Sequence, residues 1–326
     1  MNKATAVANP NIAFIKYWGK ADEALNLPAN PSLSMNLAGL TTVTTVEFRP
    51  GQPSDAVTID GQLVAGEARE RVVTHLDRVR EMAGVEQRAW VASRNDFPAG
   101  TGLASSSSAF AALSLAASRA AGLTLDEAAL SRLARLASGS ACRSVPGGFA
   151  LWEGGADGDS YARQVAPPSH WALVDVMAVV SREHKGVGSQ AGHALAPTSL
   201  FHAARLAAVP ELLATVRAAI GARDLAALGQ ATEIDALAMH GVMMTSRSPL
   251  LYWLPATLVV MQAVRSGRQG GLAAYFTLDA GPNVHCICAA EDAGRLVERL
   301  RNLPGVLDVL VSGPGAGVRL VDYHLF

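Results

Sequence analysis

The sequence predicts an α+β fold. Segments with strand character and segments with helix character both occur, but they do not alternate regularly as in the βαβ units of a doubly wound sheet. The chain has 326 residues, of which 50% are hydrophobic and 17% charged. It is therefore long enough and apolar enough to bury the core of two lobes or of one large domain.

The first half of the chain carries both kinds of pattern. Residues 41–48 alternate and are rich in β-branched side chains, and 57–64 place Asp60-Gly61 at the centre of a hairpin pattern. Apolar residues at helical spacing run over 67–83 and stop at Gly84. We also predict a strand over 89–93, a buried alanine-rich helix over 109–117, and a helix over 124–136 that opens with a capping box from Thr124 to Glu127.

The second half is richer in helices. Helices are predicted over 210–222, 225–239, 255–265 and 291–303. Strands are predicted over 171–180, 273–278, 284–289, 306–311 and 318–323. Because Pro167-Pro168 interrupts the pattern, we place a boundary near 165–180 and expect an N-terminal lobe over 1–175 and a C-terminal lobe over 176–326.

Composition excludes several classes of function. The formal net charge is −1 and no Lys/Arg run occurs, so we expect no nucleic-acid partner. Apolar stretches are broken before they reach membrane-spanning length, and the first residues lack a secretory signal, so we expect a cytoplasmic protein without membrane contact. The three cysteines suit a reducing compartment and read as core residues. Neither HExxH nor GxSxG is present, which disfavours a zinc enzyme and a serine hydrolase.

A glycine- and serine-rich stretch, PAGTGLASSSSAF, covers residues 98–110. A glycine-rich turn that enters a helix gathers free backbone N–H groups and the positive end of the helix dipole, where anions bind. The serine hydroxyls add donors, and one of them could bind a magnesium ion that bridges phosphates. Taken alone, the stretch is equally consistent with an ordinary serine-rich helix cap. A flexible linker is disfavoured because Leu103 and the apolar run behind it require burial.

Three further motifs offer charged groups. Arg143 lies among small residues in SGSACRSVPGG, where its guanidinium could bind a carboxylate or phosphate in bidentate fashion or could simply be solvated. Asp279 follows an apolar strand in TLDAGPN, which suits either a carboxylate in a cleft or a plain turn. Lys16 interrupts the apolar strand of NIAFIKYWGK, and by itself it fits an edge strand whose lysine reaches solvent slightly better than a buried, paired lysine. His240 reads as a packing or supporting group.

The ordered set of these motifs is specific. NIAFIKYWGK, PAGTGLASSSS, SGSACRSVPGGFALW and TLDAGPN together resemble the mevalonate-pathway decarboxylases of the GHMP kinase superfamily, from about residue 8 to about residue 290. The resemblance implies a two-lobed fold with a ribosomal S5-like N-terminal lobe and a ferredoxin-like C-terminal lobe. It also implies a homodimer and the use of ATP and Mg²⁺.

The resemblance implies roles for individual residues. Asp279 would face the substrate 3-hydroxyl, Arg143 would bind the substrate carboxylate and help to position Asp279, and Lys16 would stabilise charge at the reacting centre. Ser138 and Ser140 would bind substrate oxygens. The residues implied at the 5-phosphate end are Tyr17, Lys20, Arg71 and Lys185. The residues implied in ATP binding are Pro98, Gly100, Gly102, Leu103, Ser105 and Ser106, with Ser106 as the metal ligand.

The resemblance also bears on the substrate. Many bacterial enzymes that act on the diphosphate have an arginine where this chain has Gln190, and a bidentate cation is lost there. The stretches HKGVGSQAGHALAPTS, MHGVMMTS and TLDAGPNVH are most similar to phosphomevalonate decarboxylases. We therefore expect mevalonate 5-phosphate as the substrate. The alternatives are the same reaction on the 5-diphosphate, which Lys20 and Lys185 favour, and a non-catalytic metabolite-binding homologue, which the presence of Lys16, Arg143 and Asp279 disfavours.

Overall fold

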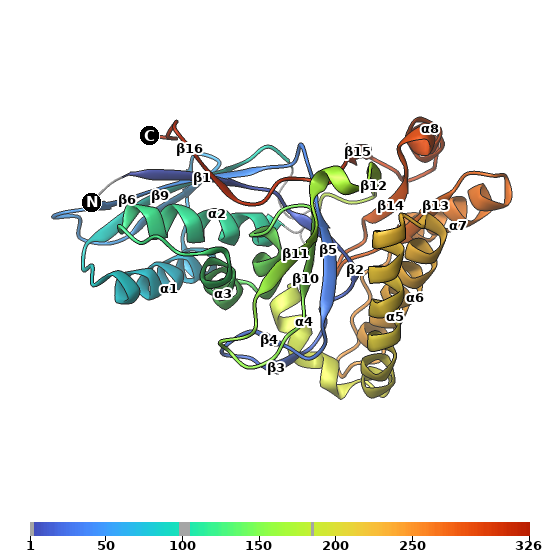
Figure 1. Ribbon diagram of the computed structural model, residues 1–326, viewed down its shortest axis with the longest axis horizontal. Coiled ribbons are helices and arrows are strands. Elements are labelled where there is room, and N and C mark those ends of the chain that lie inside the picture. Colours follow the sequence, from blue (N-terminus) through green and yellow to red (C-terminus); the bar gives the residue numbers. More distant parts are fainter. Residues whose placement is uncertain (1–2, 98–104, 184–185) are drawn as a thin grey trace.

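The computed structural model describes residues 3–97, 105–183 and 186–326 and has two lobes that mix helices and sheets (Figure 1). The α+β class and the two-lobed arrangement predicted above are thus confirmed. In the described part of the chain, a six-stranded sheet belongs to the N-terminal lobe, a four-stranded sheet lies near the middle, and a second four-stranded sheet belongs to the C-terminal lobe.

The six-stranded sheet is antiparallel except for one parallel pair, β7 with β9. Its strands, in spatial order, are β16 (Arg319–Val321), β1 (Ala4–Ala8), β6 (Thr42–Arg49), β9 (Arg88–Asn95), β7 (Ala56–Ile59) and β8 (Gln62–Leu63). The helices α1 (Gly66–Ala83), α2 (Ser105–Ala120) and α3 (Glu127–Ala137) lie on one side of this sheet (Figure 1). Strand β16 brings the C-terminal segment back to the first strand, where Val321 pairs with Thr5.

Helix α2 is the buried alanine-rich helix that the sequence predicts. Ala111, Ala112, Ala116 and Ala117 are fully buried against the strands of the N-terminal lobe. Because alanine side chains are short, the helix can approach β1 and β6 closely along its whole length. The body of α2 is therefore fixed against the sheet.

The middle sheet separates this helical layer from the C-terminal lobe. Its strands, in spatial order, are β11 (Ala162–Ala166), β10 (Phe149–Trp152), β5 (Ser32–Asn36) and β2 (Asn11–Ile15). Every residue of β2, β5 and β10 is buried. The register of β2 against β5 shifts between Ala13 and Ile15, so regular pairing is lost just before Lys16.

The C-terminal lobe is ferredoxin-like, as the resemblance implies. Its antiparallel sheet has the spatial order β13 (Ala274–Thr277), β14 (Val284–Ala289), β12 (Leu173–Val179) and β15 (Asp308–Ser312). Helices α7 (Pro255–Gln269) and α8 (Ala293–Arg301) pack on one face. Helices α5 (His202–Ala222) and α6 (Leu225–Met244) pack on each other and against both β2 and the C-terminal sheet. The remaining short elements of the described residues are the strands β3 (Lys20–Asp22) and β4 (Leu27–Pro28), the helix α4 (Ser189–Leu195), and the 3₁₀ helices η1 (Gly139–Ser144), η2 (Pro168–His170), η3 (Ala196–Thr198) and η4 (Ala290–Asp292).

Some boundaries differ from the prediction. Helix α5 begins at His202 rather than at Pro210, because the turns before the proline bury Arg205 and Val209. Helix α6 continues to Met244 because Val242 and Met243 are also buried.

The predicted capping box is also wrong. The N-cap of α3 is Asp126, which accepts a hydrogen bond from Ala129 N at 2.7 Å. Thr124 Oγ1 instead accepts one from Arg119 at 2.7 Å. The helix therefore starts two residues later than the capping-box pattern indicates.

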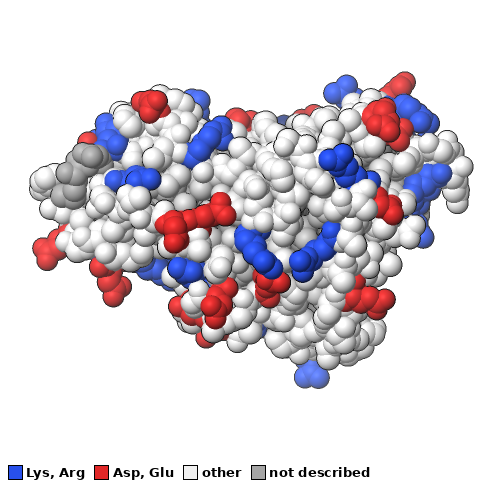
Figure 2. Space-filling view, in the orientation of Figure 1, with Lys and Arg blue, Asp and Glu red and all other residues white. Residues whose placement is uncertain are grey.

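The predicted core role of the cysteines is confirmed, since Cys142, Cys286 and Cys288 are free thiols in buried positions. None of the helices in the described ranges combines the length and the apolar character that a membrane crossing needs. On the face shown in Figure 2, basic and acidic side chains are interspersed, which agrees with the net charge of −1.

Substitutions of two glycines in α6 test how closely this helix packs against β13. A Cβ added at Gly229 would overlap the ring of Tyr275 on β13, whereas a Cβ added at Gly241 would meet nothing within 4 Å. We expect Gly229→Ala to lower the free energy of unfolding by about 1–3 kcal/mol through overpacking. Gly241→Ala should raise it by about 0.5–1 kcal/mol because alanine is the better helix former. Urea unfolding of both variants measures this, and equal effects of the two changes would contradict the close contact.

Candidate active site

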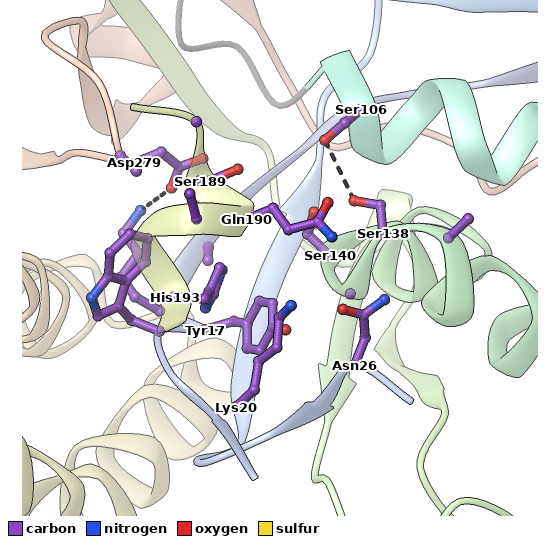
Figure 3. Close-up of a pocket in the computed structure, with 18 of the residues that line it drawn as sticks. Tyr17, Lys20, Asn26, Ser106, Ser138, Ser140, Ser189, Gln190, His193 and Asp279 are labelled. Carbon is purple, nitrogen blue, oxygen red and sulfur yellow. Dashed lines mark hydrogen bonds and ion pairs between the residues drawn. The ribbon is translucent and has the colours of Figure 1, made fainter. Parts of the chain in front are cut away.

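A cavity of 430 Å³ opens between the two lobes (Figure 3). Its walls come from the end of β2, the start of α1 and α2, the 3₁₀ helix η1, helix α4 and the turn after β13. Ten residues singled out from the sequence line this one cavity: Lys16, Tyr17, Lys20, Arg71, Ser106, Ser138, Ser140, Arg143, Gln190 and Asp279. Residues more than 260 positions apart in the sequence, such as Lys16 and Asp279, therefore meet here.

The centre of the cavity is an ion pair. Lys16 Nζ lies 2.8 Å from Asp279 Oδ1. Lys16 is 1% exposed, whereas the Asp279 side chain keeps 27% exposure toward the cavity. Strand β2 is an edge strand of the middle sheet, as the sequence favoured, but the interpretation of Lys16 as a solvent-reaching lysine is wrong: it follows the buried β2 directly and is itself buried against Asp279.

The two charges control each other's ionisation. Burial lowers the pKa of the Lys16 ammonium, although the Asp279 carboxylate opposes this. Burial alone would raise the pKa of Asp279, but Lys16, His285 and Arg143 together bring that pKa below its ordinary value. Asp279 is consequently a carboxylate at neutral pH, able to accept a hydrogen bond or a proton from a ligand.

Arg143 lies in η1 and is 4% exposed. It donates to Ser34 Oγ at 3.1 Å, to Ser32 Oγ at 2.7 Å and to Asn11 Oδ1 at 3.1 Å. These three acceptors are neutral, so the guanidinium is oriented without being neutralised by a direct ion pair, and its charge acts on the cavity. The direct partner of Asp279 is Lys16, and Arg143 acts on Asp279 through its charge.

Aromatic rings form the wall beside Lys16. The Tyr17 ring lies 4.8 Å from Trp152 and 4.2 Å from His193, measured between centroids. Gly139 allows this arrangement, because a Cβ there would lie 2.6 Å from Tyr17 Cε1. The Tyr17 hydroxyl is buried and has no hydrogen-bond partner among the described residues. A buried polar atom without a partner on a cavity wall fits a site that a polar ligand completes.

Hydroxyl groups form the opposite wall. Ser106, in the first turn of α2, lies 3.4 Å from Ser138 between Oγ atoms, and both face the cavity (Figure 3). The free N–H groups of the first turn of a helix favour an anion near this point. Pro98, Gly100, Gly102, Leu103 and Lys185 lie outside the described residues, as does the side chain of Ser105.

The residues present fit a nucleotide bound with magnesium. Among the described residues, no group of three or more His, Cys, Asp or Glu side chains could hold a metal by itself. Magnesium bound to phosphates needs few protein ligands, because phosphate oxygens and waters supply most of its coordination. The Ser106 hydroxyl can supply such a ligand beside the anion-binding start of α2.

Two of the lining cations also have partners of their own in the structure. Lys20 Nζ pairs with Glu23 at 2.7 Å. Arg71 donates to Ala137 O at 3.4 Å, and its guanidinium lies 4.9 Å from the Phe110 ring centroid.

The sequence analysis did not single out Asn26, Glu67, Ser189 or His193, which also line the cavity. Asn26 has a positive φ of 52° and donates to Arg135 O and Leu136 O, which fixes its turn beside α3. His193 Nδ1 lies 3.0 Å from Gly19 N. Both residues are placed by backbone contacts that leave no local pattern in the sequence.

Comparisons with known proteins agree along most of the chain. Residues 8–162 match the family model of the diphosphomevalonate decarboxylase-like N-terminal domain, and residues 175–308 match that of the mevalonate 5-diphosphate decarboxylase C-terminal domain. Diphosphomevalonate decarboxylase mvd1 of Aspergillus fumigatus is 36% identical over 86% of this chain and 75% of its own length. Phosphomevalonate decarboxylase of Haloferax volcanii is 34% identical over 96% of both chains.

Solved structures agree as well. Mevalonate diphosphate decarboxylase from Staphylococcus aureus is 36% identical, with a TM-score of 0.94 over 98% of both chains. MDDEF in complex with MVAPP, AMPPCP and magnesium is 38% identical, with a TM-score of 0.92 over 98% of both chains. Given both domain matches and this likeness in fold, the chain belongs to the family of diphosphomevalonate and phosphomevalonate decarboxylases, within the GHMP kinase fold.

Proposed function

We propose that this protein catalyses the ATP-dependent decarboxylation of mevalonate 5-phosphate, giving isopentenyl phosphate, ADP, phosphate and CO₂. The observation that carries this choice of substrate is Gln190 on α4, a neutral residue on the cavity wall that points toward Ser138 and Ser140 (Figure 3). An arginine there would offer a bidentate cation to a second phosphate, and glutamine offers none.

The charges of the cavity support a ligand with one phosphate. Of the lining cations, Lys16 is paired with Asp279 and Lys20 with Glu23. Arg143 and Arg71 are the lining cations without a direct carboxylate partner among the described residues. Arg143 suits the substrate carboxylate and Arg71 a single phosphate, with the unpartnered Tyr17 hydroxyl as a further donor.

The residues account for the reaction as follows. ATP supplies the phosphoryl group that converts the tertiary 3-hydroxyl into a leaving group. Asp279 accepts the hydrogen bond, and then the proton, of that hydroxyl, and Lys16 keeps Asp279 ionised for this task. The bond from carbon 3 to oxygen then breaks and phosphate leaves. The electrons of the bond that releases CO₂ form the new carbon–carbon double bond.

Arg143, Ser138 and Ser140 bind and orient the substrate. Arg143, whose own side chain is buried, binds the carboxylate that later leaves as CO₂. Ser106 and the start of α2 hold the phosphates with magnesium, as expected for positioning catalysis in phosphoryl transfer. The homodimer and the cytoplasmic location expected from the sequence stay predictions.

The second candidate function is the same reaction on mevalonate 5-diphosphate. Lys20 lines the cavity and could bind a second phosphate. The S. aureus relative, which shares the fold over 98% of the chain, is named a mevalonate diphosphate decarboxylase. Purified protein supplied with ATP, Mg²⁺ and each mevalonate phosphate in turn distinguishes the two, with CO₂ and ADP as readouts. Turnover of the diphosphate alone would reverse the choice of substrate, and ADP formation with neither would favour a binding protein.

Residue 190 offers a direct test of this choice. We expect Gln190→Arg to raise kcat/KM for the diphosphate relative to the monophosphate by roughly tenfold or more, because a charge-assisted hydrogen bond contributes about 1.5–3 kcal/mol. Gln190→Met, which has a similar length and no charge, should not raise this ratio. Steady-state kinetics on both substrates measures the ratio, and an unchanged ratio in the arginine variant would remove position 190 from substrate selection.

Asp279→Asn tests the proposed proton acceptor. The amide keeps the shape of the side chain but cannot accept a proton, so kcat should fall by roughly 10²- to 10⁴-fold. Binding of ATP, measured by calorimetry, should remain within about threefold of the wild type, since less than 1 kcal/mol is then lost. Near-normal product formation by this variant would refute the role given to Asp279.

The pH dependence of Lys16→Met tests the ion pair. The pKa of Asp279 is lowered in the folded protein, so the active carboxylate is lost only as the pH falls through that lowered value. Without the ammonium, burial raises this pKa, and the acid limb of the kcat/KM profile should move to higher pH. Lys20→Met is the matched control, because its ammonium pairs with Glu23, and its acid limb should not move. Equal shifts in the two variants would contradict the specific pairing.

A further inference from the structure

Helix α6 directs buried polar side chains at the backbone on both sides of the active site. Glu233 Oε1 accepts from Phe276 N of β13 at 3.0 Å, and Asp235 Oδ2 accepts from Lys16 N at 2.6 Å. His240 Nε2 lies 3.1 Å from Asp279 O. Asp235 is 0% exposed and His240 1% exposed. One helix therefore contacts the main chain of both members of the Lys16–Asp279 pair.

The main chain of Lys16 is held without strand pairing. The shift in register before Ile15 removes Lys16 from the ladder, and Asp235 replaces the missing acceptor for its N–H. Arg205 of α5 donates to Lys16 O at 2.8 Å and to Asp235 Oδ1 at 2.9 Å, and Asn30 also donates to Lys16 O, at 2.9 Å. Both backbone polar groups of Lys16 are thereby fixed, so the starting point of its side chain is fixed as well.

The main chain of Asp279 is held by a neutral imidazole. Burial lowers the pKa of His240 to about 3, with Lys16 acting in the same direction. The acceptor is a carbonyl oxygen, so the Nε2 of His240 must carry the proton. The Trp253 ring lies 5.0 Å away and the Tyr252 ring 6.5 Å away between centroids, which holds the imidazole between α6 and the start of α7. Gly281 N donates to the same carbonyl at 2.7 Å and closes the turn.

We propose that α6 is the alignment element of the reacting ion pair, in which Asp235 and His240 are positioning residues that set Lys16 Nζ against Asp279 Oδ1. The inference rests on the proposed roles of Lys16 and Asp279. A displacement of about 1 Å at a reacting group can reduce a rate by roughly a hundredfold. Fixing both main chains from a single rigid helix makes their separation independent of small movements between the lobes.

The competing explanation is that Asp235 and His240 only supply hydrogen bonds to buried backbone groups and so contribute to stability alone. This explanation makes a different prediction. In that case, replacing His240 would lower the free energy of unfolding, and activity would fall only in proportion to the fraction of protein that is unfolded. If His240 positions Asp279, activity is lost in folded protein, and the ionisation of Asp279 changes too. The charged and titratable groups that face Asp279 are Lys16 after β2, Arg143 of η1, His285 of β14 and His240 itself.

Three variants of α6 separate these explanations. His240→Leu removes the donor, and His240→Gln keeps an N–H at a similar reach. Leu228→Ala is the control, since Leu228 is fully buried on the same helix in the core away from the cavity lining. We expect kcat of His240→Leu to fall by roughly 10- to 100-fold. The acid limb of the kcat/KM pH profile of this variant should move to higher pH. His240→Gln should recover most of the activity.

The control sets the scale for stability. Leu228→Ala should lower the midpoint of thermal unfolding at least as much as His240→Leu but keep kcat near that of the wild type. If kcat falls in proportion to the decrease in the unfolding midpoint in both His240→Leu and Leu228→Ala, the inference is wrong. It is also wrong if His240→Gln recovers no activity.

A double-mutant cycle identifies the group through which His240 acts. In the Asp279→Asn background, His240→Leu should cause little further loss of kcat, because the aligned carboxylate is already gone. The same fold loss in both backgrounds would show that His240 does not act through Asp279.

Failure of the inference can be distinguished from failure of the proposed function. The cycle uses whichever mevalonate phosphate the wild type turns over, so a wrong choice of substrate does not affect it. If Asp279→Asn alone keeps normal turnover, the role of Asp279 and the inference both fail. If Asp279→Asn is inactive and His240→Leu behaves like Leu228→Ala, only the alignment by α6 fails.

Discussion

The ion pair between Lys16 and Asp279 is the constraint around which the rest of the molecule is arranged. A lysine that is 1% exposed is tolerated only beside a carboxylate, and here the carboxylate comes from the other lobe. Two well-packed apolar residues would serve stability equally well or better. The pair is therefore best explained by chemistry, and the surrounding fold compensates for its desolvation. Another buried pair, Arg205 with Asp235, joins α5 to α6 and holds the main chain of Lys16.

The cavity combines two kinds of buried cation. Lys16 is matched by a charge of opposite sign, whereas Arg143 is oriented by the neutral oxygens of Asn11, Ser32 and Ser34. The first arrangement holds a carboxylate in its ionised form, and the second leaves positive charge available to an anionic ligand. One cation could not both pair with the Asp279 carboxylate and leave its charge available to an anionic ligand. The proposed mechanism uses this division, because it places a proton acceptor and a carboxylate binder within the same small volume.

Much of this arrangement was predictable from local patterns. The hairpin near Asp60, the alanine-rich helix α2, the helices of the C-terminal lobe and the strand that carries both Cys286 and Cys288 follow from periodicity, and the structure contains them. Strands β5 and β10 were not predicted, although every residue in both is buried. Strand β10 (FALW) has no alternation to mark its two faces, whereas β5 (SLSMN) does alternate between polar and apolar residues but is only five residues long. The partners of Arg143 and the contact of Asp235 with Lys16 join residues more than a hundred positions apart, so no local pattern indicates them. His240 and Asp279 are 39 positions apart, which is also beyond the reach of a local pattern. Lys16, Arg143 and Asp279 were nevertheless singled out from the sequence, because each is a charged residue in apolar or small-residue surroundings. The other cavity residues that were named follow from the family resemblance, and Asn26, Glu67, Ser189 and His193 were missed.

The return of β16 to β1 has a consequence for how the protein is made. Strand β1 lies between β6 and β16, and β16 comes from residues 319–321, so one edge of the N-terminal sheet is completed by the last part of the chain. During synthesis on the ribosome, β1 and the adjoining end of α2 must wait with an open edge until the entire C-terminal lobe has emerged. The two lobes are thus not independent folding units. A fragment that ends near residue 175 would expose an unpaired strand edge, which is a site for aggregation.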